Sequence, residues 1–148
     1  MTYTLIHLGH ADIALPHTAL AGIETLSDAV PDRSDSGAWW QLQRDGRCWS
    51  LLVLDQELQP QRTPDGQQRL AVCFKHSATA ISCQSVETLA GDEVEVTLPP
   101  ALRHADTCLR GFIQLQNQVA LVVDPAKLQH RLEAFLQACQ ASASGERP

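Results

Sequence analysis

Two short stretches of the chain, ALPHTAL at residues 14–20 and AISCQSV at residues 80–86, share one pattern of apolar residues. Each opens on an apolar pair and closes on an apolar residue at the same spacing. A second matching pair follows, SLLVLD at residues 50–55 and VALVVD at residues 119–124, and both of its members end on aspartate. Two matching pairs at nearly equal offsets predict two related β-modules in one chain.

The segments around these stretches have the signals of short strands joined by turns. Asp45-Gly46 stands between two apolar-rich runs and predicts a tight hairpin, and a last hairpin is expected around Asn117. Glu93 to Leu98 alternates in polarity, as a half-exposed strand does. The sequence therefore predicts a mainly β protein of about ten short strands, arranged as small barrels or a sandwich.

The spacing changes to that of a helix after residue 124. One apolar stripe at helical spacing is formed by Leu128, Leu132, Phe135, Leu136 and Cys139. Asp124 can cap this helix, and Pro125 suits its first position. A terminal helix over residues 125–140 and a disordered tail over 142–148 are expected.

Composition disfavours several classes of protein. The chain of 148 residues has a net charge of −6 and no basic cluster, so it lacks the cationic face that a nucleic-acid partner requires. No apolar run approaches the roughly 18 residues of a membrane span, and Met1 to His10 is not a signal peptide. Five scattered cysteines predict reduced, mostly buried thiols in a cytosolic protein.

No combination of residues predicts catalysis. His7, His10 and Asp12 lie close in sequence, and the alternating residues His104, Asp106 and Cys108 come later. If the two groups met they could bind a transition metal, which keeps open a small metal-dependent enzyme. The alternative is that they are polar turn residues. Because the chain has neither a nucleophile elbow nor a glycine-rich phosphate loop, we expect no enzymatic activity, no cofactor and no metal.

Three tryptophans fall in the predicted hairpin, with arginines beside its turn. Trp39 and Trp40 are adjacent, so they point to opposite faces of a strand, and one of them should enter the core. The other is a candidate interface residue beside Arg44 or Arg47, since tryptophan and arginine are frequent in binding hot spots.

The order and spacing of several segments resemble the CheW-like domain, the adaptor module of bacterial chemosensory arrays. LIHLGHADIALP at residues 5–16 is similar to the first hairpin of that family, and RLAVCF at 69–74 to the start of its second module. LRGFIQL at 109–115, followed by VALVVD, resembles its closing hairpin. The resemblance spans nearly the whole chain, about residues 2–132.

The resemblance implies two SH3-like, five-stranded β-barrel modules that share a hydrophobic core, followed by a C-terminal helix. As one CheW-like domain over residues 1–141, the chain would have module one at about 1–68 and module two at about 69–124. It would be a cytoplasmic, non-enzymatic adaptor at membrane-bound receptor arrays. Its partners would be the tip of a methyl-accepting chemoreceptor and the regulatory domain of a CheA-type histidine kinase.

The resemblance also implies a set of protein-binding residues. Arg44 and Gly46 match the family's Arg-Gly turn beside the receptor groove, and Leu42 would lie on the apolar wall of that groove. Arg110 and Gly111 match the equivalent positions of the second module.

Three departures from the family pattern keep another function open. The Arg-Gly turn is interrupted by Asp45, the usual glutamate near Gly22 is replaced, and Gln84 stands where the family has aspartate. The alternative is a divergent scaffold for another assembly, such as a polar-localisation or partition system, without receptor coupling.

Overall fold

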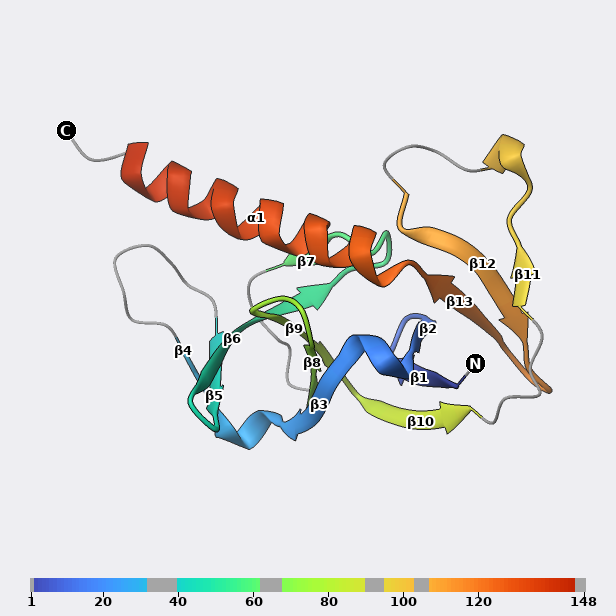
Figure 1. The fold of residues 1–148 in the computed structure, drawn as a ribbon, viewed down its shortest axis with the longest axis horizontal. Helices are drawn as coiled ribbons and strands as arrows, with labels where there is room; N and C mark the ends of the chain where they lie inside the picture. The colour runs from blue at the N-terminus through green and yellow to red at the C-terminus, as the bar shows by residue number, and fades with distance from the viewer. Residues whose placement is uncertain (1, 32–39, 62–67, 90–94, 103–106, 146–148) are drawn as a thin grey trace.

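The computed structural model describes residues 2–31, 40–61, 68–89, 95–102 and 107–145. These residues form two β-sheets and one long C-terminal helix, so the fold is mainly β (Figure 1). The first sheet has six strands in the spatial order β10-β1-β2-β13-β12-β11. Their bounds are β1 Tyr3–His7, β2 Asp12–Pro16, β10 Ser85–Leu89, β11 Glu95–Thr97, β12 Leu109–Gln114 and β13 Val119–Val123.

The second sheet has the order β3-β8-β9-β6-β5-β4, with the short strand β7 added to β6. Its strands are β3 Leu20–Thr25, β4 Ala29–Pro31, β5 Trp40–Arg44, β6 Arg47–Leu54, β7 Pro60–Gln61, β8 Leu70–Phe74 and β9 Thr79–Cys83. Short 3-10 turns precede β3 and β4 and follow β11, at His17–Ala19, Leu26–Asp28 and Pro100–Leu102.

The two sheets have the same topology. The strands of the first sheet correspond one to one with strands of the second when the sequence order starts at β10 and continues from the C-terminus to the N-terminus. In that order, β10, β11, β12, β13, β1 and β2 occupy the places of β3, β4, β5, β6, β8 and β9. In both sheets the central neighbours are parallel, β2 beside β13 and β6 beside β9, whereas the other pairs are antiparallel. The prediction of two related β-modules is therefore confirmed.

The repeated sequence pattern marks the places where the chain passes from one sheet to the other. Residues 14–20 lead from β2 into β3, and residues 80–86 lead from β9 into β10. Pro16 ends β2, and the 3-10 turn that follows redirects the chain. Each crossing therefore joins the central strand of one sheet to an edge strand of the other.

The second repeated pair also has one structural role in both modules. Asp55 follows β6, and its carboxylate accepts hydrogen bonds from the backbone N–H groups of Glu57 and Gln59 at 2.9 Å each. Asp124 follows β13 and accepts from the backbone N–H groups of Ala126 and Lys127 at 3.0 and 3.2 Å. Both aspartates thus fix the segment that leaves a central strand, which is a turn in one module and a helix in the other.

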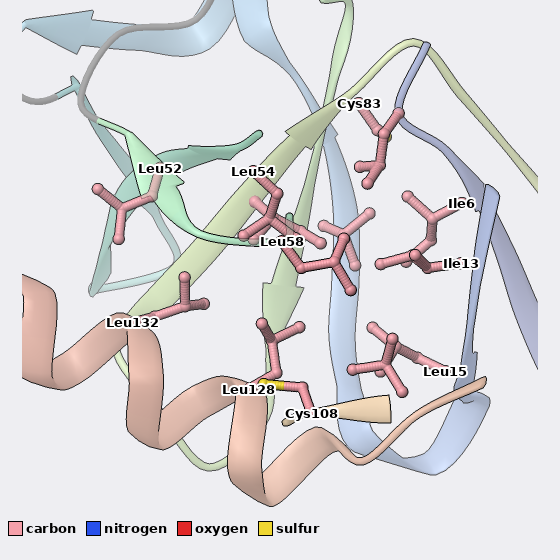
Figure 2. Packing of buried hydrophobic residues seen from close by; sticks show 14 of the residues in the cluster. Ile6, Ile13, Leu15, Leu52, Leu54, Leu58, Cys83, Cys108, Leu128 and Leu132 are labelled. Atoms are coloured by element: carbon pink, nitrogen blue, oxygen red, sulfur yellow. The ribbon is translucent and has the colours of Figure 1, made fainter. Parts of the chain in front are cut away.

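The main core lies between the two sheets and under the helix (Figure 2). Leu128 and Leu132 of the helix point toward side chains such as Leu54 and Leu58 on one side and Leu15 on the other (Figure 2). Each sheet also encloses a smaller cluster of its own, around Leu42, Trp49 and Leu51 in one module and Tyr3, Leu5 and Ile113 in the other. The modules therefore share a hydrophobic core, as predicted.

The helix α1, Pro125–Gly145, begins where the sequence predicts. Asp124 caps it and Pro125 opens it, and its apolar stripe includes the fully buried Leu128 and Leu132. The helix continues to Gly145, so the helix predicted to end at 140 was too short and the first part of the predicted tail is helical. Residues 146–148 lie outside the described residues.

Two details of the predicted modules differ from the structure. The sheets have six and seven strands among the described residues and not five, because β4, β7 and β11 are pieces of only two or three residues. The strands also interleave along the chain, whereas the prediction placed consecutive modules at 1–68 and 69–124. β1 and β2 pair with later strands of the chain, and β8 and β9 pair with β3 and β6.

The shared core makes the stability of the two modules interdependent. Leu132→Ala removes a fully buried side chain from this core and should lower the free energy of unfolding by about 2–5 kcal/mol. Urea unfolding followed by circular dichroism should still show one transition, shifted to lower urea. His130→Ala, at an exposed position of the same helix, should change the free energy by less than about 0.5 kcal/mol. Two separate transitions in Leu132→Ala would contradict a shared core.

Candidate protein-binding site

The predicted hairpin at Asp45-Gly46 is present. β5 and β6 pair directly up to Arg44 and Arg47, leaving a two-residue turn. Asp45 and Gly46 have positive φ angles of 51° and 78°, which the primed hairpin turns require. A Cβ atom at Gly46 would meet nothing within 4 Å, so there is space for a side chain. Glycine is favoured at this position because of the positive φ of the backbone.

Arg44 is exposed at the end of this hairpin and pairs with an acidic residue on β3. Its Nη1 atom lies 2.7 Å from Oε2 of Glu24, and the two side chains are 51% and 20% exposed. Although the sequence lacks the expected glutamate near Gly22, an acidic residue two positions further on reaches the arginine. Because the arginine end of this pair is half exposed, the pair contributes only modestly to folding.

Leu42 lies inside the module and not on its surface. Its side chain is fully buried and packs in the cluster with Trp49 and Leu51. Leu42 therefore cannot form the exposed apolar wall of a groove that the family resemblance implied. Leu42 points inward because it alternates with the polar residues of β5 that face outward.

Arg47 and Trp49 form a second feature beside the turn. The guanidinium carbon of Arg47 lies 4.6 Å from the centre of the Trp49 ring, within the range of a cation–π contact. The indole N–H of Trp49 donates to the carbonyl of Phe74 at 3.2 Å, and Trp49 is buried. Trp40 is half-buried against the same cluster, while Trp39 lies outside the described residues.

Arg110 has a different environment from Arg44, at the far side of the molecule on β12 (Figure 1). Its Nε and Nη2 atoms donate to the two carboxylate oxygens of Glu95 at 3.1 and 2.8 Å. Tyr3 donates its hydroxyl to Glu95 at 2.7 Å and accepts from Arg110 at 3.1 Å. These three side chains join β1, β11 and β12 beside the small cluster of the first sheet.

This network changes the acidity of its members. Hydrogen bonds from Arg110 lower the pKa of Glu95, and they outweigh the opposing effect of burial. Burial, followed by the hydrogen bond to Glu95, raises the pKa of the Tyr3 hydroxyl. Arg110 therefore stabilises an ionised carboxylate within its own module.

Gly111 is required by packing. A Cβ atom there would lie 2.3 Å from the carbonyl oxygen of Val96 on the neighbouring strand β11. The strand pairing also shifts register between Leu109 and Gly111, which leaves Arg110 as the irregular residue. Arg44 ends β5 and Gly46 lies in the turn that follows, whereas Arg110 and Gly111 lie near the start of the equivalent strand β12, so the two predicted pairs do not occupy corresponding places.

The predicted metal residues are not assembled among the described residues. His7 hydrogen-bonds to Asp12 through Nδ1 at 2.7 Å and to Glu87 through Nε2 at 3.0 Å, so both ring nitrogens are occupied. Burial lowers the pKa of His7, but these carboxylates outweigh it and raise the pKa overall. His10 bonds to the carbonyl of Leu54 instead. His104 and Asp106 fall outside the described residues, and no group of three metal-ligating side chains gathers among the others.

The cysteines are mostly buried, as predicted, since only Cys48 of the five is exposed. Burial raises the pKa of the Cys73 thiol, with a further contribution from the charge of Glu24, and that of the Cys83 thiol, each to about 12. Both groups therefore remain protonated at neutral pH and are poor nucleophiles. None of the helices in the described part of the chain is long and apolar enough to span a membrane.

Comparison with solved structures defines the class of fold. The chain is similar to the crystal structure of the scaffolding protein TtCheW from Thermoanaerobacter tengcongensis, with a TM-score of 0.60 and 12% sequence identity. The similarity covers 82% of this chain and 87% of that chain. No protein-family model and no curated protein sequence matches the chain. The protein therefore has a divergent CheW-like fold, with two SH3-like β-modules and a terminal helix.

The Glu95–Arg110 pair generates a prediction about acid stability. Because the pKa of Glu95 is lowered on folding, its contribution is present at neutral pH and is lost as the pH falls through the folded-state value. Arg110→Ala should therefore lower the free energy of unfolding at pH 7 by about 1–3 kcal/mol. The difference from the wild type should shrink as the pH falls below about 4, the usual range of carboxylates. Urea unfolding at a series of pH values measures this, and a difference that does not depend on pH would contradict the role given to Arg110.

Proposed function

We propose that the protein is a non-enzymatic adaptor that couples chemoreceptors to a CheA-type histidine kinase in a chemotaxis or pilus-motility pathway. The observation that carries the proposal is the CheW-like fold, in which two equivalent sheets pack on one shared core. The similar protein TtCheW is described as a scaffolding protein. As an adaptor, the chain would act as a single domain over residues 1–141 in the cytoplasm, beside membrane-bound receptor arrays.

The physical form of the described residues agrees with a role in assembly. Several strand edges in the two sheets, such as those of β3 and β10, pair on one side only in the described structure. Such edges and the exposed hairpin turn offer backbone and side-chain groups for docking. The buried cysteines and the fully engaged His7 are held in structural roles, and no group of three metal-ligating side chains gathers among the described residues.

Arg44 and Gly46 are the residues that we propose for contact with a partner. Gly46 fixes the shape of the turn through its positive φ, and Arg44 extends from the end of β5 with about half of its side chain exposed. Leu42 supports the hairpin from inside the module, and Arg110 and Gly111 act in folding of the other module.

The first experiment is titration calorimetry of the full chain against the regulatory domain of a CheA-type kinase from the same genome. We expect binding in the micromolar range, which corresponds to about −8 kcal/mol. Absence of heat at two temperatures would count against kinase coupling and would favour the alternative of a scaffold for another assembly, which co-purification from the native cell would then identify.

Reversal of the charge at Arg44 tests its proposed role. Arg44→Glu should weaken binding of the receptor tip by about tenfold or more, equal to about 1.4 kcal/mol, because a partner contact is lost. The thermal midpoint should fall by a few degrees at most, since Arg44 is half exposed and its pair with Glu24 lies at the surface end of the hairpin. The double variant Glu24→Arg with Arg44→Glu places the same charges in exchanged positions and should not restore binding. Affinity equal to that of the wild type in Arg44→Glu would remove Arg44 from the interface.

A further inference from the structure

A groove borders the first two turns of α1, between the helix and the segments at residues 56–59 and 107–109. It consists of two connected hollows with volumes of about 480 and 290 Å³, a range typical of ligand sites. Both hollows are lined by Gln59, Thr107, Cys108 and Arg131, so they form one continuous depression that we call the α1 groove. Its larger end is bordered by Lys127 and His130 of the helix, and its smaller end by the leucines Leu58, Leu109 and Leu121 together with polar side chains such as Gln56 and Glu57.

The walls of the α1 groove are fixed by hydrogen bonds. Nη1 of Arg131 donates to the carbonyl of Leu58 at 3.1 Å, which ties the helix to the turn on the opposite wall. That turn is held by Asp55, and the start of the helix is capped by Asp124. Because both walls are anchored, the groove exists before any partner arrives, and little ordering is needed on binding.

The charge of the groove is opposite to that of the whole chain. The protein has a net charge of −6, yet the larger end of the groove has Lys127, Arg131 and His130 along its border and no carboxylate among its described lining residues. The one acidic side chain in the described lining is Glu57, at the smaller end. Because basic side chains border a lining that also contains apolar side chains, a partner segment that has both carboxylates and apolar side chains is complementary to the groove.

The position of Lys127 is unfavourable for the helix. It lies in the first turn of α1, where the helix dipole is positive and a lysine is repelled. Asp124 accepts the backbone N–H of Lys127 and caps the helix, and no acidic residue occupies the first turn itself. Lys127 lowers the stability of the helix start, and it borders a preformed hollow. Residues that lower local stability are often found at binding sites.

We propose that the α1 groove is a docking site for an acidic, amphipathic peptide segment of a partner protein. Carboxylates of the segment lie against Lys127, His130 and Arg131, and its leucine-like side chains lie toward Leu58, Leu109 and Leu121. The groove is a second site, separate from the hairpin turn at Arg44, and its test does not require that the kinase or receptor be the partner.

The test uses the full ¹⁵N-labelled chain and the synthetic peptide Ac-LEELLEEL-NH₂ as the probe. Titration followed by amide NMR should give saturable shifts at Thr107, Cys108, Lys127 and Arg131, with a Kd of about 1 mM or tighter. The basic peptide Ac-LKKLLKKL-NH₂ should give no saturable shift. Absence of saturable shifts with the acidic peptide, or equal shifts with the basic one, would overturn the proposal.

Lys127→Glu separates binding from folding. It should weaken the acidic peptide by at least about fivefold while leaving the thermal midpoint equal or higher, because a glutamate suits the first turn of a helix. Lys127→Ala should weaken the peptide to a smaller degree. The control Lys75→Glu makes the same charge change at an exposed lysine outside the groove lining and should keep wild-type affinity. Equal affinity in Lys127→Glu and wild type overturns the proposal.

A titration with inorganic phosphate distinguishes a peptide site from a site for small anions. Phosphate at the same concentration should give weaker shifts, because it cannot reach the apolar end of the groove. If phosphate alone reproduced the shifts of the peptide and lost them in Lys127→Glu, the groove would bind small anions and the peptide proposal would be wrong.

Discussion

The core between the two sheets is the constraint on which the rest of the structure depends. The clusters inside the individual modules contain several small side chains, such as Ala71 and Ala80 in one and Ala14 and Ala120 in the other. The cluster between the sheets is built mainly from leucine, isoleucine, valine and phenylalanine. Because burial of apolar area is the main driving force of folding, neither module has an adequate core alone. The two sheets and α1 are therefore one cooperative unit.

This constraint explains why the chain crosses twice between the sheets. β2 and β9 are buried on both faces, since one face meets the interior of their own module and the other meets the shared core. A strand in this position is apolar or small along most of its length, which gives it the signature of a parallel-sheet strand, although β9 also buries the hydroxyls of Thr79 and Ser82. The two crossings near Pro16 and Gln84 then carry the chain to the edge strands of the opposite sheet. Partner-facing residues are left to the edges and turns.

The sequence predicted this fold where the signal was local or repeated. The Asp45-Gly46 turn, the Asp124 cap and the two repeated stretches each lie within a few residues, and each was recognised from pattern alone, although the pattern did not show that the repeated stretches cross between the sheets. The interleaving of strands was missed because pairing of β2 with β13 joins the two ends of the chain, and no local pattern encodes it. The role of Arg110 was missed for the same reason, since Tyr3 is 107 residues away in sequence. Burial of Leu42 could have been inferred from its alternation with polar neighbours.

Three basic residues, Arg44, Arg110 and Lys127, differ in how much the fold depends on their charge. Arg110 satisfies a carboxylate and a hydroxyl within its module, so its charge is already used for folding. Arg44 has an exposed pair that contributes little to folding, and Lys127 opposes the dipole of its own helix. A rigid shared core permits such positions, because the loss of a fraction of a kcal/mol at the surface does not unfold a cooperative unit. Side chains that contribute little to stability, and that lie on rigid elements, can be substituted during evolution without unfolding the protein.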